Sequence, residues 1–172
     1  MIRPTAMIMA GGTGGHVFPA LATARVLRAR GFDIVWLGTR RGIEARLVPA
    51  EGIPVEWLSV SGLRGKGVTT LLAAPFRLML ALVQALRAVR RHRPGVVLGA
   101  GGFASGPGGI AAWLLRRPRV VHEQNAVAGL TNRVLARFAD RVLEGFPGSF
   151  GAGVQAERVG NPVRPEIADV AP

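Results

Sequence analysis

The sequence contains no cysteine and no tyrosine, and it is poor in aromatic and acidic residues. Without cysteine the chain forms no disulfide and no thiolate metal site, and its redox compartment cannot be read from thiols. Aromatic side chains make up only 6% of the residues, which argues against a surface on which nucleic-acid bases stack. Apolar residues make up 49%, which indicates an aliphatic α/β core and gives no sign of disorder.

The chain length of 172 residues suits one ordinary domain and is short for two. The residues before the first glycine cluster, 1–10, are too few for a secretory signal peptide with its charged, apolar and cleavage regions. We therefore expect a single domain and a cytoplasmic location.

The shortage of acidic residues is concentrated in one region. Between Trp57 and His122 there are ten Lys or Arg residues and no Asp or Glu, within a chain of net charge +12. Such a region indicates an anionic partner, which is nucleic acid, an anionic membrane or a phosphorylated substrate. Arginine supplies 21 of the 22 cations, so genomic base composition explains the choice of Arg over Lys but not the missing acids.

Short apolar segments alternate with longer helical patterns along most of the chain. Strands are expected at residues 7–10, 32–38, 54–60, 95–102, 119–125 and 140–146, with a short last one within 157–165. Helices are expected at residues 17–30, 42–52, 69–91, 104–115 and 130–138. Strands that are apolar throughout suit a parallel sheet covered on both faces. The pattern predicts an α/β, Rossmann-like, doubly wound sheet, in which strand order 3-2-1-4-5 makes the first and fourth strands neighbours.

Two glycine clusters follow the first and fourth expected strands. They are "GGTGGH" (Gly11–His16) and "GAGGFASGPGG" (Gly99–Gly109). In a doubly wound sheet the carboxyl ends of neighbouring strands meet at the ligand-binding edge. Glycine allows close backbone approach, and the amides at a helix start favour an anion. Two such loops facing one another predict a diphosphate site.

Three other ligand motifs are incomplete. A dinucleotide fingerprint requires a third glycine where Val17 stands, and an acidic residue near the end of the second strand, which ends at Thr39. A nucleotide-hydrolysing loop requires Gly-Lys-Ser/Thr, but the only lysine, Lys66, lies in another loop. The pair His122-Glu123 has no second histidine one helical turn later, so we expect no metal site.

Polar side chains cluster after the fifth strand, in "HEQNAVAGLTNR". His16 and Glu123 are candidates for proton transfer, although a histidine at a helix start also serves as a cap or a phosphate ligand. Asn125 suits a sugar or base hydroxyl. Arg164, in "GNPVR", suits a phosphate or a carboxylate.

The stretch "VTTLLAAPFRLMLALVQALRAVRRHRP" is apolar enough to suggest a membrane span. Pro75, Arg77 and Gln84 interrupt it, and the sheet needs it as the crossover between the third and fourth strands. We expect a helix that buries one face and presents another to a membrane surface, with nearby cations attracting anionic lipid. Core packing is the alternative for each member of the apolar stripe, which consists of Leu72, Phe76, Met79 and Val83.

Seven motifs in order along the chain resemble one family. They are "MAGGTGGHVFPALA", "WLGT", "SGLRGKG", "AAPFR", "VVLGAGGFASGPGGIAAW", "HEQNAVAGLTN" and "VGNPVR". Together they resemble the amino-terminal domain of the MurG family, the bacterial transferases that add N-acetylglucosamine to lipid I to form lipid II in peptidoglycan synthesis. The resemblance covers essentially the whole chain.

The resemblance implies the amino-terminal half of an inverting GT-B glycosyltransferase without an obligatory metal or other cofactor. The implied donor is UDP-N-acetylglucosamine, and the implied acceptor is the C4 hydroxyl of the muramyl sugar on undecaprenyl diphosphate. An anionic membrane lipid is a further implied partner, nucleic acid is not, and the implied location is the cytoplasmic face of the bacterial inner membrane as a peripheral protein.

The resemblance also assigns residues. The catalytic candidates are His16 and Glu123. The residues implied near the donor are Thr13, Gly14, Gly15, Asn125 and Arg164. The residues implied near the acceptor diphosphate are Gly12, Thr13, Gly14, Gly101, Gly102, Ser105 and Gly106. The implied membrane patch consists of Leu72, Phe76, Met79, Leu82, Trp113 and the bordering Arg137.

Family members are roughly twice as long as this sequence. We therefore expect residues 1–164 to form the acceptor and membrane-binding domain and residues 165–172 to begin an interdomain linker. The donor domain is expected to be absent, so that the chain alone does not turn over. The alternative is one natural half of a split transferase whose donor half is a separate chain.

Overall fold

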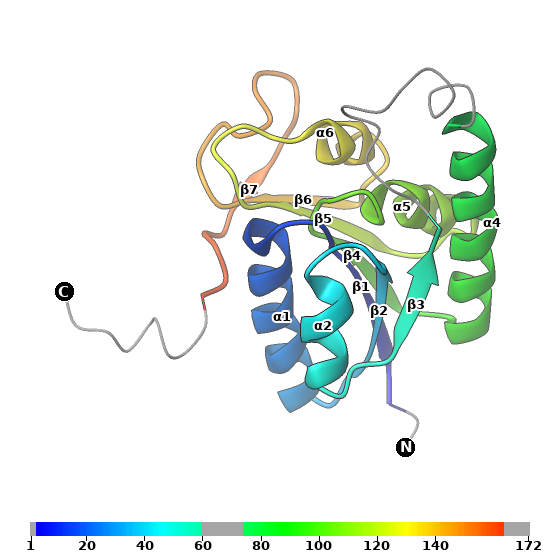
Figure 1. The fold of residues 1–172 in the computed structure, drawn as a ribbon. Helices are drawn as coiled ribbons and strands as arrows, with labels where there is room; N and C mark the ends of the chain where they lie inside the picture. Colours follow the sequence, from blue (N-terminus) through cyan, green and yellow to red (C-terminus); the bar gives the residue numbers. More distant parts are fainter. Residues whose placement is uncertain (1–2, 60–73, 164–172) are drawn as a thin grey trace.

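The computed structural model describes residues 3–59 and 74–163, which form one parallel β-sheet with helices on both faces (Figure 1). The sheet has seven strands in the order β3-β2-β1-β4-β5-β6-β7. The strands are β1 (Thr5–Met9), β2 (Asp33–Thr39), β3 (Val55–Leu58), β4 (Val96–Gly99), β5 (Arg119–Glu123), β6 (Arg141–Glu144) and β7 (Glu157–Arg158). The helices of the described residues are α1 (Gly14–Ala29), α2 (Glu44–Ala50), α4 (Ala74–His92), α5 (Ser105–Leu114) and α6 (Leu130–Ala136).

The predicted doubly wound, Rossmann-like α/β fold, the strand order 3-2-1-4-5 and the pairing of the first strand with the fourth are confirmed. The main difference is that α1 begins at Gly14, three residues before the predicted start, so the first glycine loop runs directly into a helix. The start of the helix expected at 69–91, Leu72, the expected domain end at Arg164 and the expected linker lie outside the described residues.

The first strand shows why its sequence is apolar throughout. Ala6 and Ile8 pack with α1 and α2 in one core cluster, whereas Met7 and Met9 pack with α4 and α5 in another. Both faces of the sheet are therefore covered, as Figure 1 shows, and alternate side chains of one strand enter opposite cores.

The register of the sheet places the two glycine loops side by side. In the pairing of β1 with β4, Met9 lies opposite Gly99, so both strands end at the same level. The loops after β1, β4 and β5 consequently emerge at one edge, which we call the carboxyl edge.

Candidate functional site

The first glycine loop leaves a helix start open at the carboxyl edge. Gly12 has a φ of +93°, which places the backbone in a region that glycine adopts without strain. Thr13 is the N-cap of α1, but its side chain makes no capping hydrogen bond. Within the described residues, the amides of Gly14 and Gly15 have no hydrogen-bond acceptor. These two amides and the dipole of α1 favour a bound anion.

The second glycine loop packs directly against the first. Gly102 has a φ of +83°, and a Cβ atom there would overlap the backbone of Gly11. A Cβ atom at Gly101 would lie 2.7 Å from Cε1 and Nδ1 of His16. The predicted juxtaposition of the loops is confirmed. Their glycines are required for loop-to-loop contact, independently of any ligand.

The first loop is held from below by a carboxylate that sequence reasoning missed. Glu44, fully buried at the start of α2, accepts hydrogen bonds from the Gly12 amide at 3.0 Å and from the amide and hydroxyl of Thr39 at 3.1 and 2.8 Å. Gly11 and Gly42 make room for this carboxylate, since a Cβ atom at either position would overlap it. Gly12 was predicted to bind the diphosphate. This prediction is wrong for its amide, because the amide already donates to Glu44.

Ser105 is a second correction among the predicted diphosphate residues. Its hydroxyl is fully buried and lies 2.8 Å from both the Met9 and the Gly101 carbonyl oxygens. The side chain therefore holds α5 onto β1 and the second loop, and its hydroxyl hydrogen is already used. Gly106 is half-buried and lies next to Thr131 of α6.

His16 lies at the start of α1 and is the first member of a chain of hydrogen bonds. Its Nδ1 is 2.9 Å from Oε1 of Gln124. Nε2 of Gln124 is 3.0 Å from Nδ1 of His122, and Nε2 of His122 is 3.0 Å from the Gly160 carbonyl oxygen. Burial lowers the pKa of His122, against the opposing effects of the Gly160 hydrogen bond and the Glu123 charge. This series of hydrogen bonds joins the first loop to the segment that follows β7.

Glu123 is fully buried at the end of β5 and is saturated with donors. Its carboxylate accepts four hydrogen bonds, from the amide and side chain of Asn125, the amide of Gly129 and the side chain of Asn132. Burial acts to raise the pKa of Glu123, but these hydrogen bonds outweigh it and lower the pKa below its usual range. The arrangement favours an organising role for Glu123 over that of a general base.

Asn125 is exposed at the carboxyl edge. Its side-chain nitrogen donates to Glu123 at 2.8 Å, and its carbonyl oxygen accepts from Ser149 at 2.8 Å. Its Oδ1 makes no hydrogen bond within residues 3–59 and 74–163 and is available to a ligand. Thr13 and Gly15 are also exposed, whereas Arg164 lies outside the described residues.

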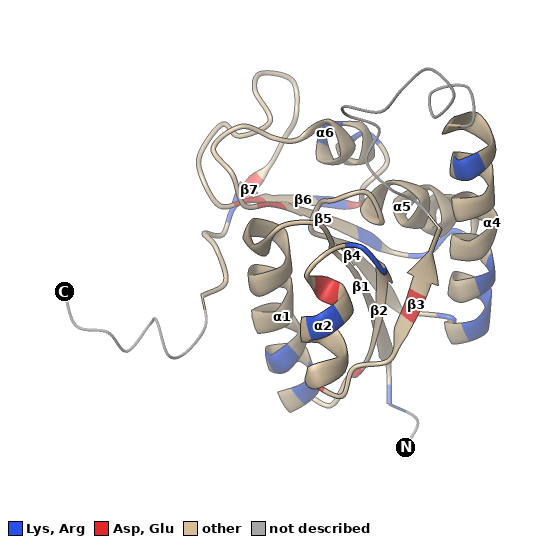
Figure 2. Ribbon diagram, viewed as in Figure 1, with Lys and Arg blue, Asp and Glu red and all other residues tan. Residues whose placement is uncertain are grey.

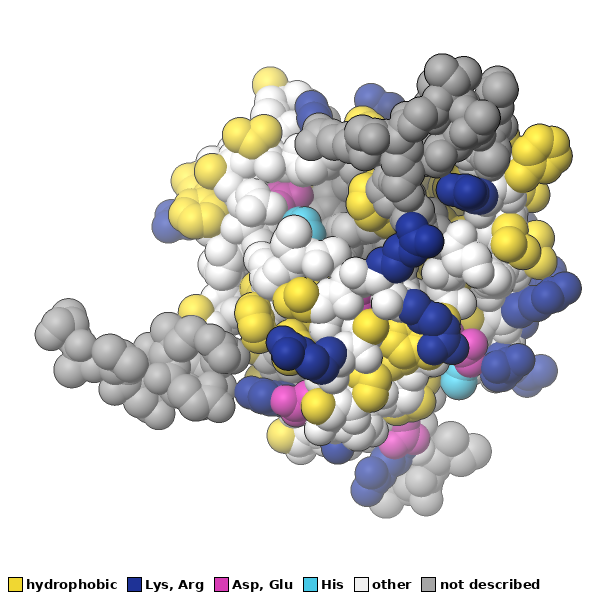
Figure 3. All heavy atoms as spheres, in the orientation of Figure 1, with side chains coloured by type: hydrophobic (Ala, Val, Ile, Leu, Met, Phe, Trp, Pro, Cys, Tyr) yellow, Lys and Arg dark blue, Asp and Glu magenta, His cyan; other side chains and the backbone are white. Residues whose placement is uncertain are grey.

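An exposed apolar surface covers the outer side of α4, α5 and α6. Phe76 and Met79 are 80% and 61% exposed, and the ring of Trp113 lies 5.1 Å from that of Phe138. Figure 3 shows apolar side chains over the upper end of α4, and Figure 2 shows the arginines of its last turns at the lower end. We call this surface the outer apolar face. Its members are Phe76, Leu78, Met79, Leu80, Trp113, Leu114, Leu130, Val134 and Phe138.

One predicted member of the membrane patch is corrected. Leu82 is half-buried and packs against the core cluster beneath α4. Leu78 and Leu80 are exposed instead, at 53% and 48%. Arg137 is exposed beside Phe138 at the end of α6.

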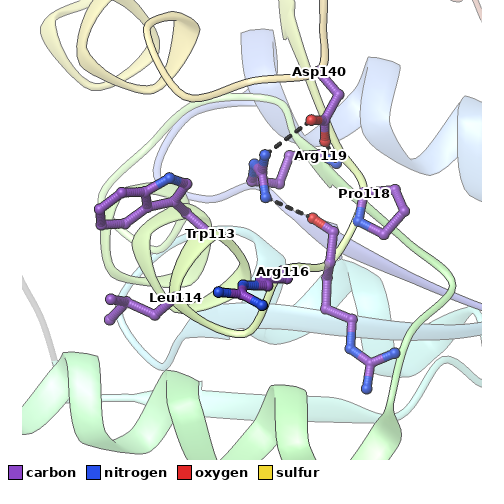
Figure 4. A pocket seen from close by; sticks show the side chains of 7 residues that line it. Trp113, Leu114, Arg116, Pro118, Arg119 and Asp140 are labelled. Carbon is purple, nitrogen blue, oxygen red and sulfur yellow. Dashed lines mark hydrogen bonds and ion pairs between the residues drawn. The ribbon is translucent and has the colours of Figure 1, made fainter.

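A hollow of about 550 Å³ adjoins the outer apolar face, at the amino end of β5 and therefore away from the glycine loops (Figure 4). Trp113 lines it, together with Arg116, whose φ is +51°, and Arg119. Figure 4 shows Arg119 joined to Asp140, at 2.9 Å, and to the Arg117 carbonyl oxygen. The hollow thus places arginines at the border of the outer apolar face.

The described residues lack both a metal-binding cluster and a membrane-spanning helix. Within residues 3–59 and 74–163, no cluster of His, Cys, Asp and Glu side chains has the composition of a metal site. None of the helices in that part of the chain is both long and apolar enough to span a membrane.

Comparison with known proteins identifies what the chain is similar to. Residues 6–144 match the glycosyltransferase family 28 N-terminal domain. The crystal structure of MurG from Acinetobacter baumannii superposes with a TM-score of 0.80 at 43% identity, covering 98% of this chain and 50% of that one.

Two curated relatives carry the name UDP-N-acetylglucosamine–N-acetylmuramyl-(pentapeptide) pyrophosphoryl-undecaprenol N-acetylglucosamine transferase. The protein of Nitrosococcus oceani is 62% identical over 165 residues, covering 96% of this chain and 46% of the relative. The protein of Alkalilimnicola ehrlichii is 64% identical over 164 residues, covering 95% and 46%. The chain spans about half the length of the curated relatives it matches.

Proposed function

Because the chain belongs to the glycosyltransferase family 28 N-terminal domain family, we propose that it forms the acceptor-binding half of a hexosyltransferase of GT-B fold. The names of its relatives support a transfer of N-acetylglucosamine from UDP-N-acetylglucosamine to a muramyl sugar on undecaprenyl diphosphate. The product of this reaction is a precursor of peptidoglycan.

The observation that carries this proposal is the contact between the two glycine loops at the carboxyl edge. The free amides of Gly14 and Gly15 offer donors to one phosphate, and the helix start adds a favourable dipole. The second loop, at Gly101 and Gly102, borders the same place. The donor sugar nucleotide approaches Thr13, Gly15 and Asn125, which are exposed along this edge.

The reaction proceeds by direct displacement. The oxygen of the acceptor hydroxyl forms a bond to the anomeric carbon while the bond from that carbon to UDP breaks, and UDP leaves with the electron pair. His16 accepts the hydroxyl proton, since it lies at the contact of the two loops and its Nε2 makes no hydrogen bond within the described residues. Glu123 holds the loop after β5, as its hydrogen bonds indicate.

The outer apolar face supports a peripheral position on the cytoplasmic side of a membrane. Phe76 and Met79 are large apolar side chains that are mostly exposed, and arginines border the face. An exposed apolar surface with cations beside it is typical of a site of membrane contact. A lipid surface fits this combination better than nucleic acid does, because six of the nine members of the face are aliphatic side chains, which do not stack on bases. In sedimentation with vesicles, the chain is expected to bind anionic vesicles more strongly than neutral ones. Equal absence of binding to both would remove the membrane from the proposal.

Acceptor binding by the chain itself tests the main proposal. Calorimetry with a short-prenyl analogue of diphosphate-linked muramyl pentapeptide is expected to show binding, weakened about tenfold or more when one phosphate is removed. The control ligand is UDP-N-acetylglucosamine, which is expected to bind more weakly than the acceptor analogue does. A folded chain that binds the sugar nucleotide and not the acceptor analogue would contradict the assignment of this half to the acceptor.

A further inference from the structure

We propose that Gln124 is a positioning residue that fixes the tautomer of His16 and so leaves Nε2 of His16 as its proton acceptor. The inference rests on the proposed function for its catalytic consequence. The tautomer itself follows from hydrogen-bond geometry in the chain.

The orientation of the Gln124 side-chain amide is set by a backbone carbonyl oxygen, which can only accept hydrogen bonds. Nε2 of Gln124 lies 3.0 Å from the backbone carbonyl oxygen of His122. A carbonyl oxygen has no hydrogen to donate, so the NH₂ group of Gln124 must occupy this side. The opposite orientation would place two oxygens in contact. Oε1 of Gln124 therefore faces His16.

The amide orientation decides which nitrogen of His16 carries the hydrogen. Oε1 of Gln124 lies 2.9 Å from Nδ1 of His16 and can only accept, so Nδ1 must donate. In the neutral ring the lone pair is then on Nε2. The Nδ1 and Cε1 side of the ring packs on Gly101, where a side chain would overlap it. The second loop and Gln124 thus hold one side of the ring and leave the other side to a ligand.

The second hydrogen of the Gln124 amide continues the chain. It points to Nδ1 of His122 at 3.0 Å, which makes this nitrogen an acceptor and gives Nε2 of His122 the hydrogen that it donates to Gly160. The side chain of Asn161 donates to the backbone carbonyl oxygen of Gln124 at 3.0 Å and so holds the main chain of this residue. The bonds that fix the side-chain amide are those of Oε1 to His16 and of Nε2 to the ring and the carbonyl oxygen of His122, so both ends of the amide are used in this orientation.

Because its amide is neutral, Gln124 can orient the His16 ring but cannot take up its proton or stabilise its charge as a carboxylate would. When Nε2 of His16 takes the proton of the acceptor hydroxyl, the ring becomes an imidazolium whose Nδ1 hydrogen stays bonded to Gln124. The amide accepts no proton and carries no charge. Gln124 consequently orients the ring and fixes its tautomer without the electrostatic stabilisation that a carboxylate partner would add.

The tautomer is measurable in the 172-residue chain, which has only three histidines. Long-range ¹H–¹⁵N spectra of histidine-labelled protein at neutral pH are expected to show His16 protonated at Nδ1 and His122 protonated at Nε2. Gln124→Met, which keeps the length of the side chain and removes both polar atoms, is expected to shift the His16 ratio toward the Nε2 form by about 3- to 10-fold. Gln124→Glu keeps an acceptor for Nδ1 of His16 but loses both donors to His122, so the Nδ1 form of His16 is expected to persist while the tautomer of His122 changes. His92, on α4, serves as the unchanged internal control.

Two results would overturn the proposal. One is an unsubstituted chain in which His16 is protonated at Nε2, a result that needs no variant. The other is a Gln124→Met chain that is folded and has an unchanged His16 tautomer.

Kinetics test the catalytic consequence in a fusion of this chain to the carboxyl-terminal half of the Nitrosococcus oceani relative. Gln124→Met is expected to lower kcat by about 10- to 100-fold with KM for both substrates within about twofold, and Gln124→Glu to recover part of kcat. An unchanged kcat would refute a positioning role in the reaction. Absence of transfer by the unsubstituted fusion would instead count against the proposed function, because the tautomer result stands without any turnover.

Discussion

The carboxyl edge of the sheet and the outer apolar face are built on opposite principles. At the carboxyl edge, three buried carboxylates each accept hydrogen bonds from loop amides: Glu44 beneath the first glycine loop, Glu123 at the end of β5 and Glu144 at the end of β6. On the outer apolar face, Phe76 and Met79 extend into solvent from the first turns of α4, whose buried residues begin at Ala81. The edge is held in one geometry from inside, whereas the side chains of the face are exposed to solvent.

The difference predicts where substitutions act. A change at the carboxyl edge removes partners from buried polar groups and lowers the free energy of unfolding. A change on the outer apolar face leaves the fold almost untouched and affects only what the chain binds.

The largest expected effect is at Glu44. Glu44→Ala leaves the amides of Gly12 and Thr39 without their acceptor and opens a space beneath the loop, so we expect a loss of about 3 to 5 kcal/mol in urea unfolding. The control is Glu51→Ala, whose carboxylate pairs with Arg25 near the surface and whose loss should remove at most about 1 kcal/mol. Equal effects of the two substitutions would show that the carboxylate does not hold the loop.

A smaller loss of stability is expected from substitutions in the two glycine loops, and its size should differ between them. Gly102→Ala combines a positive φ with overlap of the Gly11 backbone, and about 2 to 4 kcal/mol of destabilisation is expected. Gly12→Ala has the same kind of backbone, with nothing within 4 Å of the new Cβ atom, and about 1 to 2 kcal/mol is expected. Thermal and urea unfolding of both variants give the difference. If Gly12→Ala lowered the free energy of unfolding more than Gly102→Ala does, the loops would not pack as described.

Acid titration probes the buried groups of the carboxyl edge in two windows. The pKa of His122 is lowered by burial, so the unfolded chain takes up a proton first and stability falls as the pH drops below about 6.5. The pKa of Glu123 is lowered by its hydrogen bonds, so its contribution is complete above about pH 4.5 and is lost as the pH falls through its folded-state pKa. Urea unfolding between pH 3 and 8 should show both steps. His122→Asn should flatten only the first, and an unchanged first step in that variant would exclude His122 as its source.

The sequence predicted the sheet and the pairing of the two glycine loops better than the contacts around them. Alternating apolar strands and helices are local patterns, so the strand order and the paired glycine loops followed from them. The hydrogen bond from Gly12 to Glu44 joins residues 32 apart, and that from His16 to Gln124 joins residues 108 apart. No local pattern marks either partner, because the folded sheet brings them together.

Leu82 shows the corresponding limit for a helix. A stripe of 3.6-residue period correctly placed Phe76 and Met79 at the surface. One turn later α4 packs against α5 and β3, so Leu82, which the family resemblance had assigned to the membrane patch, is half-buried. The sequence period indicates which residues share a helix side, but the neighbouring elements decide where that side becomes covered.

The smallest expected effect on stability, and the largest on binding, concerns the outer apolar face. Phe76→Ser and Met79→Ser remove side chains that are 80% and 61% exposed, so the free energy of unfolding should change by no more than about 0.5 kcal/mol. Transfer of either side chain into a lipid interface contributes about 1 to 2 kcal/mol, so each variant should bind anionic vesicles about 5- to 30-fold more weakly. Val26→Ser, at a position 52% exposed on α1 and on the other side of the sheet, is the matched control and should bind as the unsubstituted chain does. Equal weakening by Val26→Ser would show that vesicle binding reflects general apolar exposure, and the contrast between the carboxyl edge and the outer apolar face would then lose its functional meaning.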